Sequence, residues 1–418
     1  MIKNFLNSPT KKRLVENFLS LSALQAVNYL LPLITLPYLV RILGPEKFGL
    51  IAFAQSFIQY FNILTDYGFN LSATKEISIH RDNKEKVSEI FSSVMIIKFG
   101  LMIISFLILS FLVFTIPKFR NNWLVYFFTF GMVLGNVLFP IWFFQGMERM
   151  KYITILNMVA KLIFTVSIFV FVHQVSDYIF VPLINSLGFL LAGLIALMIV
   201  FKDFRIGFKM PSIYDLKNQL KEGWYVFITS IQSIVLSSSS VFVLGIFEKG
   251  SIVGYYAAVE KLLKAFVSMF APLTQALFPV SSFKLARNKS EGKRFIFKIS
   301  LIIMPFVIVV VILLVVFAKQ LLILIFTEDY GHYAIILQVL SVWLFLAVLN
   351  NFIGVQYLLG VGYSSYYFKS MSFAGIIALL IYFTLTPNFS FYGVLLGMIC
   401  GELSLTLTML YYIKRYKL

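Results

Sequence analysis

Apolar runs of about 20 residues recur along the whole chain, with short polar segments between them. An α-helix of that length crosses the hydrocarbon core of a bilayer, because each residue adds about 1.5 Å. The runs therefore predict twelve membrane-spanning helices. Their expected bounds are 14–40, 47–66, 91–115, 122–144, 153–173, 178–200, 223–247, 254–280, 295–317, 331–358, 370–386 and 391–413. The first run continues into the second without a small-residue cleavage site, so we do not expect a signal peptide.

A long polar and basic segment, residues 202–222, divides these runs into two groups of six. We expect an N-terminal six-helix bundle over residues 1–201, a cytoplasmic linker over 202–222 and a C-terminal six-helix bundle over 223–418. An even number of helices gives both halves the same orientation in the membrane, which is the arrangement of parallel repeats. The predicted fold class is therefore an all-α membrane protein of two repeated bundles.

A faint sequence echo at an offset of 205 residues supports the two repeats. The segment FGLIAFA at 48–54 aligns with VGYYAAV at 253–259, and the same offset sets Pro32–Thr35 against Ser237–Ser240. Irregular or polar positions at membrane depth in both halves point to the central site of a transporter. Prolines that kink helices and serines that let helices pack closely are the alternative interpretation. The positions predicted to line one cavity are Thr35, Ser237 and Ser240.

Composition excludes an ordinary soluble protein. Of the 418 residues, 60% are hydrophobic and 13% are charged, against about 25% charged in soluble domains. The single cysteine, Cys400, excludes an internal disulfide, and the three histidines have no ligand-like spacing. We therefore expect no metal and no cofactor.

The basic residues predict the orientation of the chain. With the N-terminus inside, 25 of the 35 lysines and arginines fall in cytoplasmic segments, six fall on the opposite face and four lie within the spans. Insertion retains positive charge on the cytoplasmic side, so both termini are predicted to be cytoplasmic. The net charge of +17 is then a topology signal, and nucleic acid is not an expected partner.

The run 254–280 carries three charges within five positions, Glu260, Lys261 and Lys264. A charge near the bilayer centre costs about 2.5 to 3.5 kcal/mol, so such groups face a partner, water or a substrate path. Glu260 and Lys264 are four residues apart and can pair on one helix face, which leaves one lysine over. A local ion pair with a snorkelling lysine is one interpretation. A cationic site for an anionic substrate is the other.

Four segments carry a family resemblance, and they occur in order along the chain. They are NYLLPLITLPYLVRILGPEKFG (28–49), TDYGFNLSATKEIS (65–78), WFFQGMERMKYI (142–153) and YYAAVEKL (255–262). They resemble the Wzx-type lipid-linked oligosaccharide flippases of the multidrug/oligosaccharidyl-lipid/polysaccharide exporter superfamily. The resemblance implies two six-helix bundles around a central cavity, as in the multidrug exporters of that superfamily. It also implies that undecaprenyl-pyrophosphate-linked repeat units of a surface polysaccharide such as O-antigen move to the outer leaflet of the bacterial inner membrane.

A pyrophosphate reaches membrane depth only where fixed cations replace its hydration. The candidate substrate-binding residues are Lys98, Lys161, Lys261, Lys264 and, at the outer mouth, Arg41. The candidate gating or ion-coupling residues are Asp66, Glu260 and Glu402. Alternatives stay open for three of them: Asp66 can form a helix-end hydrogen bond, Glu402 can be a buried structural acid, and Arg41 can bind lipid phosphate.

Two other classes of protein are weighed against a flippase of oligosaccharides. A drug or cation antiporter needs an acidic or aromatic cavity, whereas four interior lysines against three acids favour an anion; a lipid II flippase is a further alternative. A membrane polymerase needs catalytic groups on large outer loops, and no predicted outward loop carries them, so we expect no enzyme. Expected partners are the lipid-linked glycan and the bilayer, with a polysaccharide polymerase and a chain-length regulator as further candidates.

Overall fold

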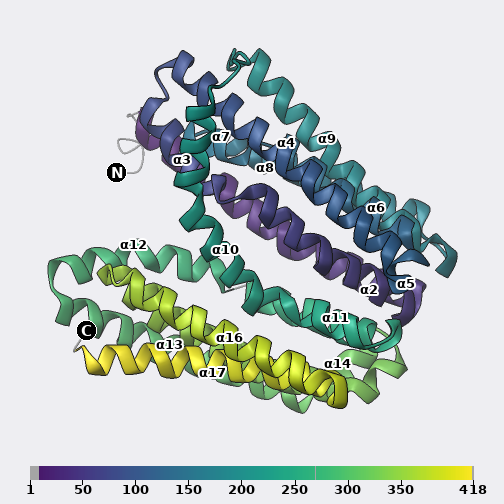
Figure 1. Cartoon of the computed structure of the whole chain (residues 1–418). Coiled ribbons are helices and arrows are strands. Elements are labelled where there is room, and N and C mark those ends of the chain that lie inside the picture. The colour runs from purple at the N-terminus through teal and green to yellow at the C-terminus, as the bar shows by residue number, and fades with distance from the viewer. Residues whose placement is uncertain (1–8, 269, 417–418) are drawn as a thin grey trace. The chain divides into compact units, whose positions relative to one another are not determined.

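The computed structural model describes residues 9–268 and 270–416, and all of its regular structure there is helical (Figure 1). Side chains are described from residue 31 onward, apart from 236, 237, 269, 271, 272, 275, 276 and the last two residues. Contacts divide the chain into two compact units. Unit 1 comprises residues 54–231 with the residues before Pro32, and unit 2 comprises 32–53 with 232–418. The division into bundles at residues 202–222 stays a prediction.

Helices of the first part of the chain follow the predicted runs. They are α2 (Pro9–Asp66), α3 (Phe69–His80), α4 (Lys84–Thr115), α5 (Pro117–Arg120), α6 (Trp123–Leu138), α7 (Ile141–Gly146), α8 (Met150–Phe171), the 3-10 turn η1 (Val175–Ile179) and α9 (Phe180–Lys202). The later elements are α10 (Ile213–Phe247), α11 (Gly250–Ser268), α12 (Ala271–Arg287), α13 (Lys289–Val316), α14 (Ala318–Ile325), η2 (Glu328–Tyr333), α15 (Ala334–Asn350), the π-helix η3 (Asn351–Leu359), α16 (Ser364–Phe389) and α17 (Phe391–Arg415).

The number of spans agrees with the predicted twelve. By length and hydropathy, nine helical stretches of the described chain can cross a membrane, and α10 makes a tenth if its two parts are one span. That count treats α2 as a single span, although α2 is broken at Gly44, whose φ is 68°. Two predicted spans therefore lie within α2. The remaining predicted span is divided between α11 and α12 and carries the charged group described below.

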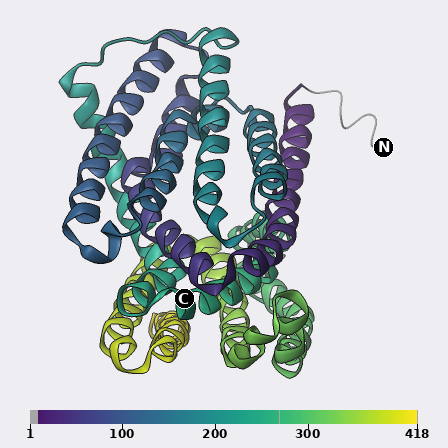
Figure 2. The same ribbon diagram turned by 90° about the vertical axis from the view of Figure 1, so that its right-hand side faces the viewer.

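Unit 1 consists of long helices packed side by side, and shorter helices with a buried aromatic cluster close one end of it. Helix α6 packs against α4 and α9, and α9 also packs against α8 (Figures 1 and 2). At one end, α3 packs against α7 and α4 around the fully buried Trp142, Phe143 and Phe144. The aromatic part of the WFFQGMERM segment is therefore a core element of this unit.

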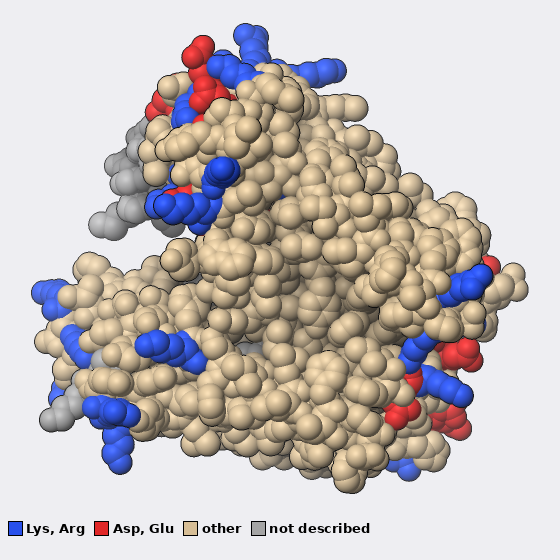
Figure 3. Space-filling view, in the orientation of Figure 1, with Lys and Arg blue, Asp and Glu red and all other residues tan. Residues whose placement is uncertain are grey.

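Unit 2 is built around α15. This helix packs against α11, α13 and α17, and α16 lies along α17 (Figure 1). Apolar side chains cover the outer faces of helices in both units, for example Phe306 at 62% and Phe111 at 68% exposure. On each unit the charged side chains visible in Figure 3 lie toward the helix ends, with apolar surface between. A lipid-facing surface has this pattern, since lipid tails solvate apolar side chains.

Two glycines that the sequence echo aligns, Gly49 and Gly254, meet inside unit 2. A Cβ on Gly254 would overlap the carbonyl of Pro45, and a Cβ on Gly49 would overlap that of Gly250. Gly49 on α2 faces two glycines four apart on α11, Gly250 and Gly254, and these small residues let the backbones touch, as in close helix pairs of other membrane proteins. The echo at offset 205 therefore marks a packing contact between the second part of α2 and α11.

We predict that Gly254→Ala destabilises the purified protein, because the new methyl group must push the α2 and α11 backbones apart. Overpacking of this kind costs about 1 to 3 kcal/mol. The matched control is Gly100→Ala in α4, where a Cβ meets nothing within 4 Å; it should be neutral or slightly stabilising. Thermal unfolding in detergent measures both variants, and equal midpoints for the two would contradict the close contact.

Candidate functional site

The three charges of the 254–280 run form a compact group with Ser240 in unit 2. Glu260 is 3% exposed, and its carboxylate lies 3.1 Å from the Lys264 ammonium and accepts a hydrogen bond from the Ser240 hydroxyl. Lys261 places its ammonium 5.3 Å from the centre of the Phe48 ring. The predicted pairing of Glu260 with Lys264 is confirmed. The group keeps a formal charge of +1, because two lysines accompany one carboxylate.

The predicted cavity positions have different surroundings. Thr35 is 6% exposed and Ser240 is 2% exposed, and the Ser240 hydroxyl is engaged by Glu260. The side chain of Ser237 lies outside the described residues. That these three positions line one cavity stays a prediction.

Arg41 holds the end of a helix within unit 2. Its guanidinium donates to the carbonyls of Leu324, Ile325 and Phe326, at 2.5 Å for Leu324 and 2.8 Å for Phe326. These carbonyls lie at the C-terminal end of α14, where backbone carbonyls lack partners within the helix and a cation also complements the helix dipole. In this conformation the guanidinium is therefore used structurally, and its contact with substrate stays a prediction.

In unit 1 the buried charge is Lys98. Its side chain is 1% exposed, and its ammonium lies 2.8 Å from Asp66, which is 36% exposed and also accepts a hydrogen bond from Asn70. Asp66 ends α2 and Lys98 lies in the middle of α4, so the pair ties two predicted spans together. The carboxylate thus neutralises this lysine, and its role with substrate stays a prediction. Lys161 is half-buried on α8.

Glu402 belongs to a buried polar network in unit 2. The Asn350 amide donates to the Glu402 carboxylate at 2.5 Å, and the Thr406 hydroxyl donates to the Asn350 amide oxygen at 2.6 Å. Asn350 directly precedes the π-helix η3, and Gln356 within η3 donates to the Thr274 carbonyl. Short π-helical segments occur often at functional sites. The ion-coupling role of Glu402 stays a prediction.

Sequence reasoning missed the amides of these networks, although amides inside apolar runs were the available signal. Besides Asn350 and Gln356, Asn136 on α6 donates to Asn62 on α2 at 2.9 Å. The described residues contain no group of three His, Cys, Asp or Glu side chains placed to hold a metal ion. Ion pairs and amide networks engage the buried charges and amides named above.

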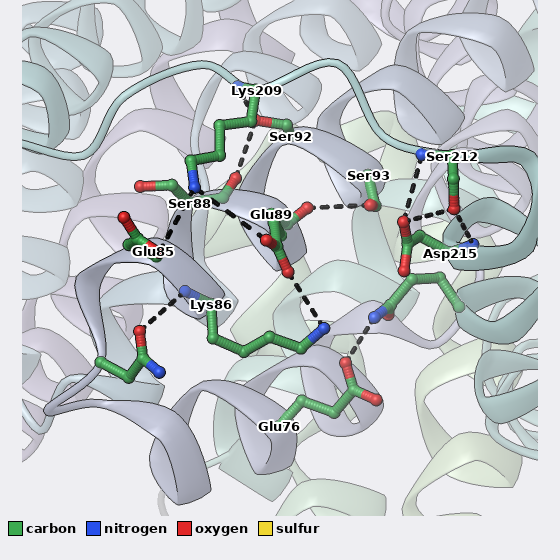
Figure 4. Close-up of polar contacts among 12 residues, drawn as sticks. Glu76, Glu85, Lys86, Ser88, Glu89, Ser92, Ser93, Lys209, Ser212 and Asp215 are labelled. Atoms are coloured by element: carbon green, nitrogen blue, oxygen red, sulfur yellow. Dashed lines mark hydrogen bonds and ion pairs between the residues drawn. The ribbon is translucent and has the colours of Figure 1, made fainter.

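An extended strap between α9 and α10, residues 203–212, lies along α4 in unit 1 (Figure 4). The backbone N–H groups of Gly207 and Lys209 donate to the hydroxyls of Ser88 and Ser92, at 3.3 and 2.9 Å. Serines four apart lie on one helix face, which matches alternate residues of an extended chain. The strap ends where Asp215 accepts hydrogen bonds from Ser212. The basic linker is therefore a fixed part of unit 1.

Two of the resemblance segments also pack on each other in unit 1. The Thr74 hydroxyl donates to the Trp142 carbonyl at 3.1 Å, and a Cβ on Gly146 would collide with Ile77. No local pattern of residues predicted that these two segments meet. Their contact explains why the motifs combine small and polar residues.

The helical spans and the apolar outer surface define a polytopic membrane protein. Among solved structures, the fold is similar to "Lipid II flippase MurJ, inward closed conformation", with a TM-score of 0.74 at 13% identity over 96% of this chain and 87% of that one. It is also similar to an inward-facing multidrug resistance MATE family transporter of the MOP superfamily, with a TM-score of 0.65 at 17% identity, over 92% of this chain and 94% of that one. These likenesses concern the fold.

Sequence comparison gives the family. Residues 14–284 match the family described as polysaccharide biosynthesis protein, and the chain belongs to that family. A protein of Escherichia coli (strain K12), named as a proposed O-antigen transporter, is 32% identical over 98% of both chains. One of Shigella dysenteriae with the same name is 28% identical over 70% of this chain and 72% of its own.

We predict unequal effects when the Asp66–Lys98 pair is broken. Asp66→Asn strands an ammonium that is 1% exposed and should cost about 3 kcal/mol. Lys98→Gln leaves a carboxylate that water can reach, and it should cost less than half as much. The double variant should recover most of the loss, because it strands neither charge. Thermal unfolding of the four proteins measures the cycle, and additive losses in the double variant would contradict a stabilising pair.

Proposed function

We propose that the protein is a flippase that moves lipid-linked oligosaccharide repeat units, carried on undecaprenyl pyrophosphate, across the bacterial inner membrane by alternating access. The observation that carries this proposal is the likeness over 98% of the chain to a protein named as a proposed O-antigen transporter. The family match and the flippase-like fold support the same class of activity. The polysaccharide would be an O-antigen or a related surface polymer.

The charges of the membrane interior suit an anionic substrate. Glu260, Lys261 and Lys264 keep one formal positive charge, and the Lys264 side chain is 32% exposed. A lysine presents a compact point charge on a flexible stem, which suits an anion that must also be released. Lys161 is a further predicted contact. Two others, Lys98 and Arg41, would need a conformation in which their present partners are displaced.

A multidrug antiporter and a lipid II flippase share this fold. The curated relatives are named for O-antigen transport, so we place these two activities second. The inward location of both termini, the inner membrane as the site of action and association with a polymerase and a chain-length regulator belong to this proposal. A transporter of this kind is not an enzyme.

Orientation is tested by cysteine labelling from outside intact cells. In a Cys400→Ser background, we expect a cysteine at Lys289 to resist a membrane-impermeant maleimide, because the basic segment 284–298 is predicted to be cytoplasmic. A cysteine at Asn388, predicted to face outward, is the matched control and should react. Labelling at position 289 would reverse the orientation.

Transport is tested by complementation of a bacterial strain that lacks its own O-antigen transporter but makes the matching repeat unit. Parental protein should restore surface polymer and should not raise resistance to cationic drugs. Lys264→Ala should abolish polymer export at normal protein levels, and Lys264→Arg should keep part of it, since charge matters more than shape.

The double variant Glu260→Gln, Lys264→Gln separates substrate binding from mere pairing. If Lys264 binds the anion, the double variant stays inactive. Full recovery of export in the double variant would show that Lys264 only neutralises Glu260. Drug resistance without polymer export would favour the antiporter.

A further inference from the structure

A cavity of about 520 Å³ opens at the end of unit 1 where three chain connections meet. Arg81, Asp82 and Lys84 line it from the α3–α4 connection, Arg149 lines it from the α7–α8 connection, and Asp203 and Ile206 line it from the start of the strap. Its volume lies within the usual range for small-molecule sites, about 300 to 1,000 Å³. The basic residues here belong to segments predicted to be cytoplasmic.

The wall contributed by the WFFQGMERM segment is held firmly. Its base is the buried aromatic cluster of Trp142, Phe143 and Phe144. Above this base, Glu148 adopts a φ of 56°, a strained conformation for a residue other than glycine, and its carboxylate pairs with Arg81 at 2.8 Å. Strain of this kind persists where surrounding contacts enforce it, and it occurs often at ligand sites. The turn sets the direction of the following residue, Arg149.

The strap forms another part of the cavity wall. Its position is fixed by the hydrogen bonds from Gly207 and Lys209 to the α4 serines and by the buried side chain of Ile206 (Figure 4). Asp203 precedes these anchors and lies at the cavity. Both walls are therefore preorganised, which lowers the entropy cost of binding a ligand.

Only some of the charged side chains of the cavity are held in an ion pair. Arg81 is paired with Glu148, whereas Lys84, Arg149, Asp82 and Asp203 form no ion pair within the described part of the chain. An arginine guanidinium can donate two hydrogen bonds to the oxygens of one phosphate, and a lysine ammonium adds a second positive charge. The two carboxylates would repel a bare anion, but they accept hydrogen bonds from hydroxyl groups. The complementary ligand therefore carries a phosphate and neighbouring hydroxyls.

We propose that this cavity binds a sugar phosphate, with Arg149 and Lys84 holding the phosphate and Asp82 and Asp203 holding sugar hydroxyls. The site is distinct from the charges within the spans. Only the identity of its natural source rests on the proposed function: the head of a lipid-linked glycan presents this chemistry at the membrane surface, and a soluble sugar phosphate presents it as well.

Binding is tested by calorimetric titration of the full chain in phosphatidylcholine nanodiscs with glucose 1-phosphate, inorganic phosphate and glucose. The parent should bind glucose 1-phosphate more tightly than phosphate. Lys84→Gln with Arg149→Gln should weaken both phosphate probes by about tenfold or more. The matched control is Lys75→Gln, which removes an exposed charge from α3 outside the cavity and should change neither affinity.

The variant Asp203→Asn separates contacts to the sugar hydroxyls from contacts to the phosphate. It should weaken glucose 1-phosphate but leave inorganic phosphate equal or tighter, because the repelling charge is lost and the neutral amide oxygen is a weaker acceptor for sugar hydroxyls than the carboxylate. Equal tightening of both probes would overturn the sugar contact, and unchanged binding in the double lysine and arginine variant would overturn the site. If Arg149→Gln does not accumulate, Lys84→Gln alone tests the same cavity.

Competition identifies the source of the ligand. Undecaprenyl-diphosphate-linked sugar in the nanodisc should displace glucose 1-phosphate if the natural ligand is lipid-borne, and it should not if the ligand is soluble. Binding is measured without transport, so its failure is distinguishable from failure of the proposed function. Absent binding with intact polymer export overturns only this site, whereas intact binding with absent export overturns only the flippase.

Discussion

The low dielectric of the bilayer is the constraint on which the rest of this structure depends, because each buried charge there needs a partner. Both units meet it with a carboxylate and a lysine: Asp66 with Lys98 in unit 1, and Glu260 with Lys264 in unit 2. The backbone meets the same constraint through helices, and Arg41 satisfies carbonyls where α14 ends. The buried charges of the spans are thus engaged by other protein groups, either carboxylates or backbone carbonyls.

Close backbone packing is the second consequence of a lipid environment. Lipid tails are as apolar as leucine, so helices gain little from burying apolar faces and instead gain from van der Waals fit. Gly49 and Gly254 provide that fit between α2 and α11. The break of α2 at Gly44, where φ is positive, redirects the chain without exposing a long loop. A small number of glycines therefore determines how the chain runs through the first part of unit 2.

The sequence predicted features that follow from local spacing. Apolar run length located the helices, and a separation of four residues predicted the Glu260–Lys264 pair. Contacts between distant segments carry no such signal: Lys98 pairs with a residue 32 positions away, and Arg41 binds carbonyls more than 280 positions away. The strap was expected only as a linker, because extended segments that bind through backbone N–H groups have no side-chain signature. These contacts depend on how distant segments of the chain come together in the fold, which local spacing does not encode.

An anion that enters the membrane interior must compete with the carboxylates that already pair with the buried lysines. At Lys98 an incoming phosphate competes with Asp66, which is 36% exposed and can be hydrated when it is displaced. At Lys264 it competes with Glu260, whose side chain is 4% exposed and also accepts a hydrogen bond from the Ser240 hydroxyl. Stranding Glu260 costs more, because a carboxylate without water loses most of its solvation. The second lysine beside it, Lys261, offsets part of that cost, since its positive charge still balances the Glu260 carboxylate after the anion has joined the Lys264 ammonium.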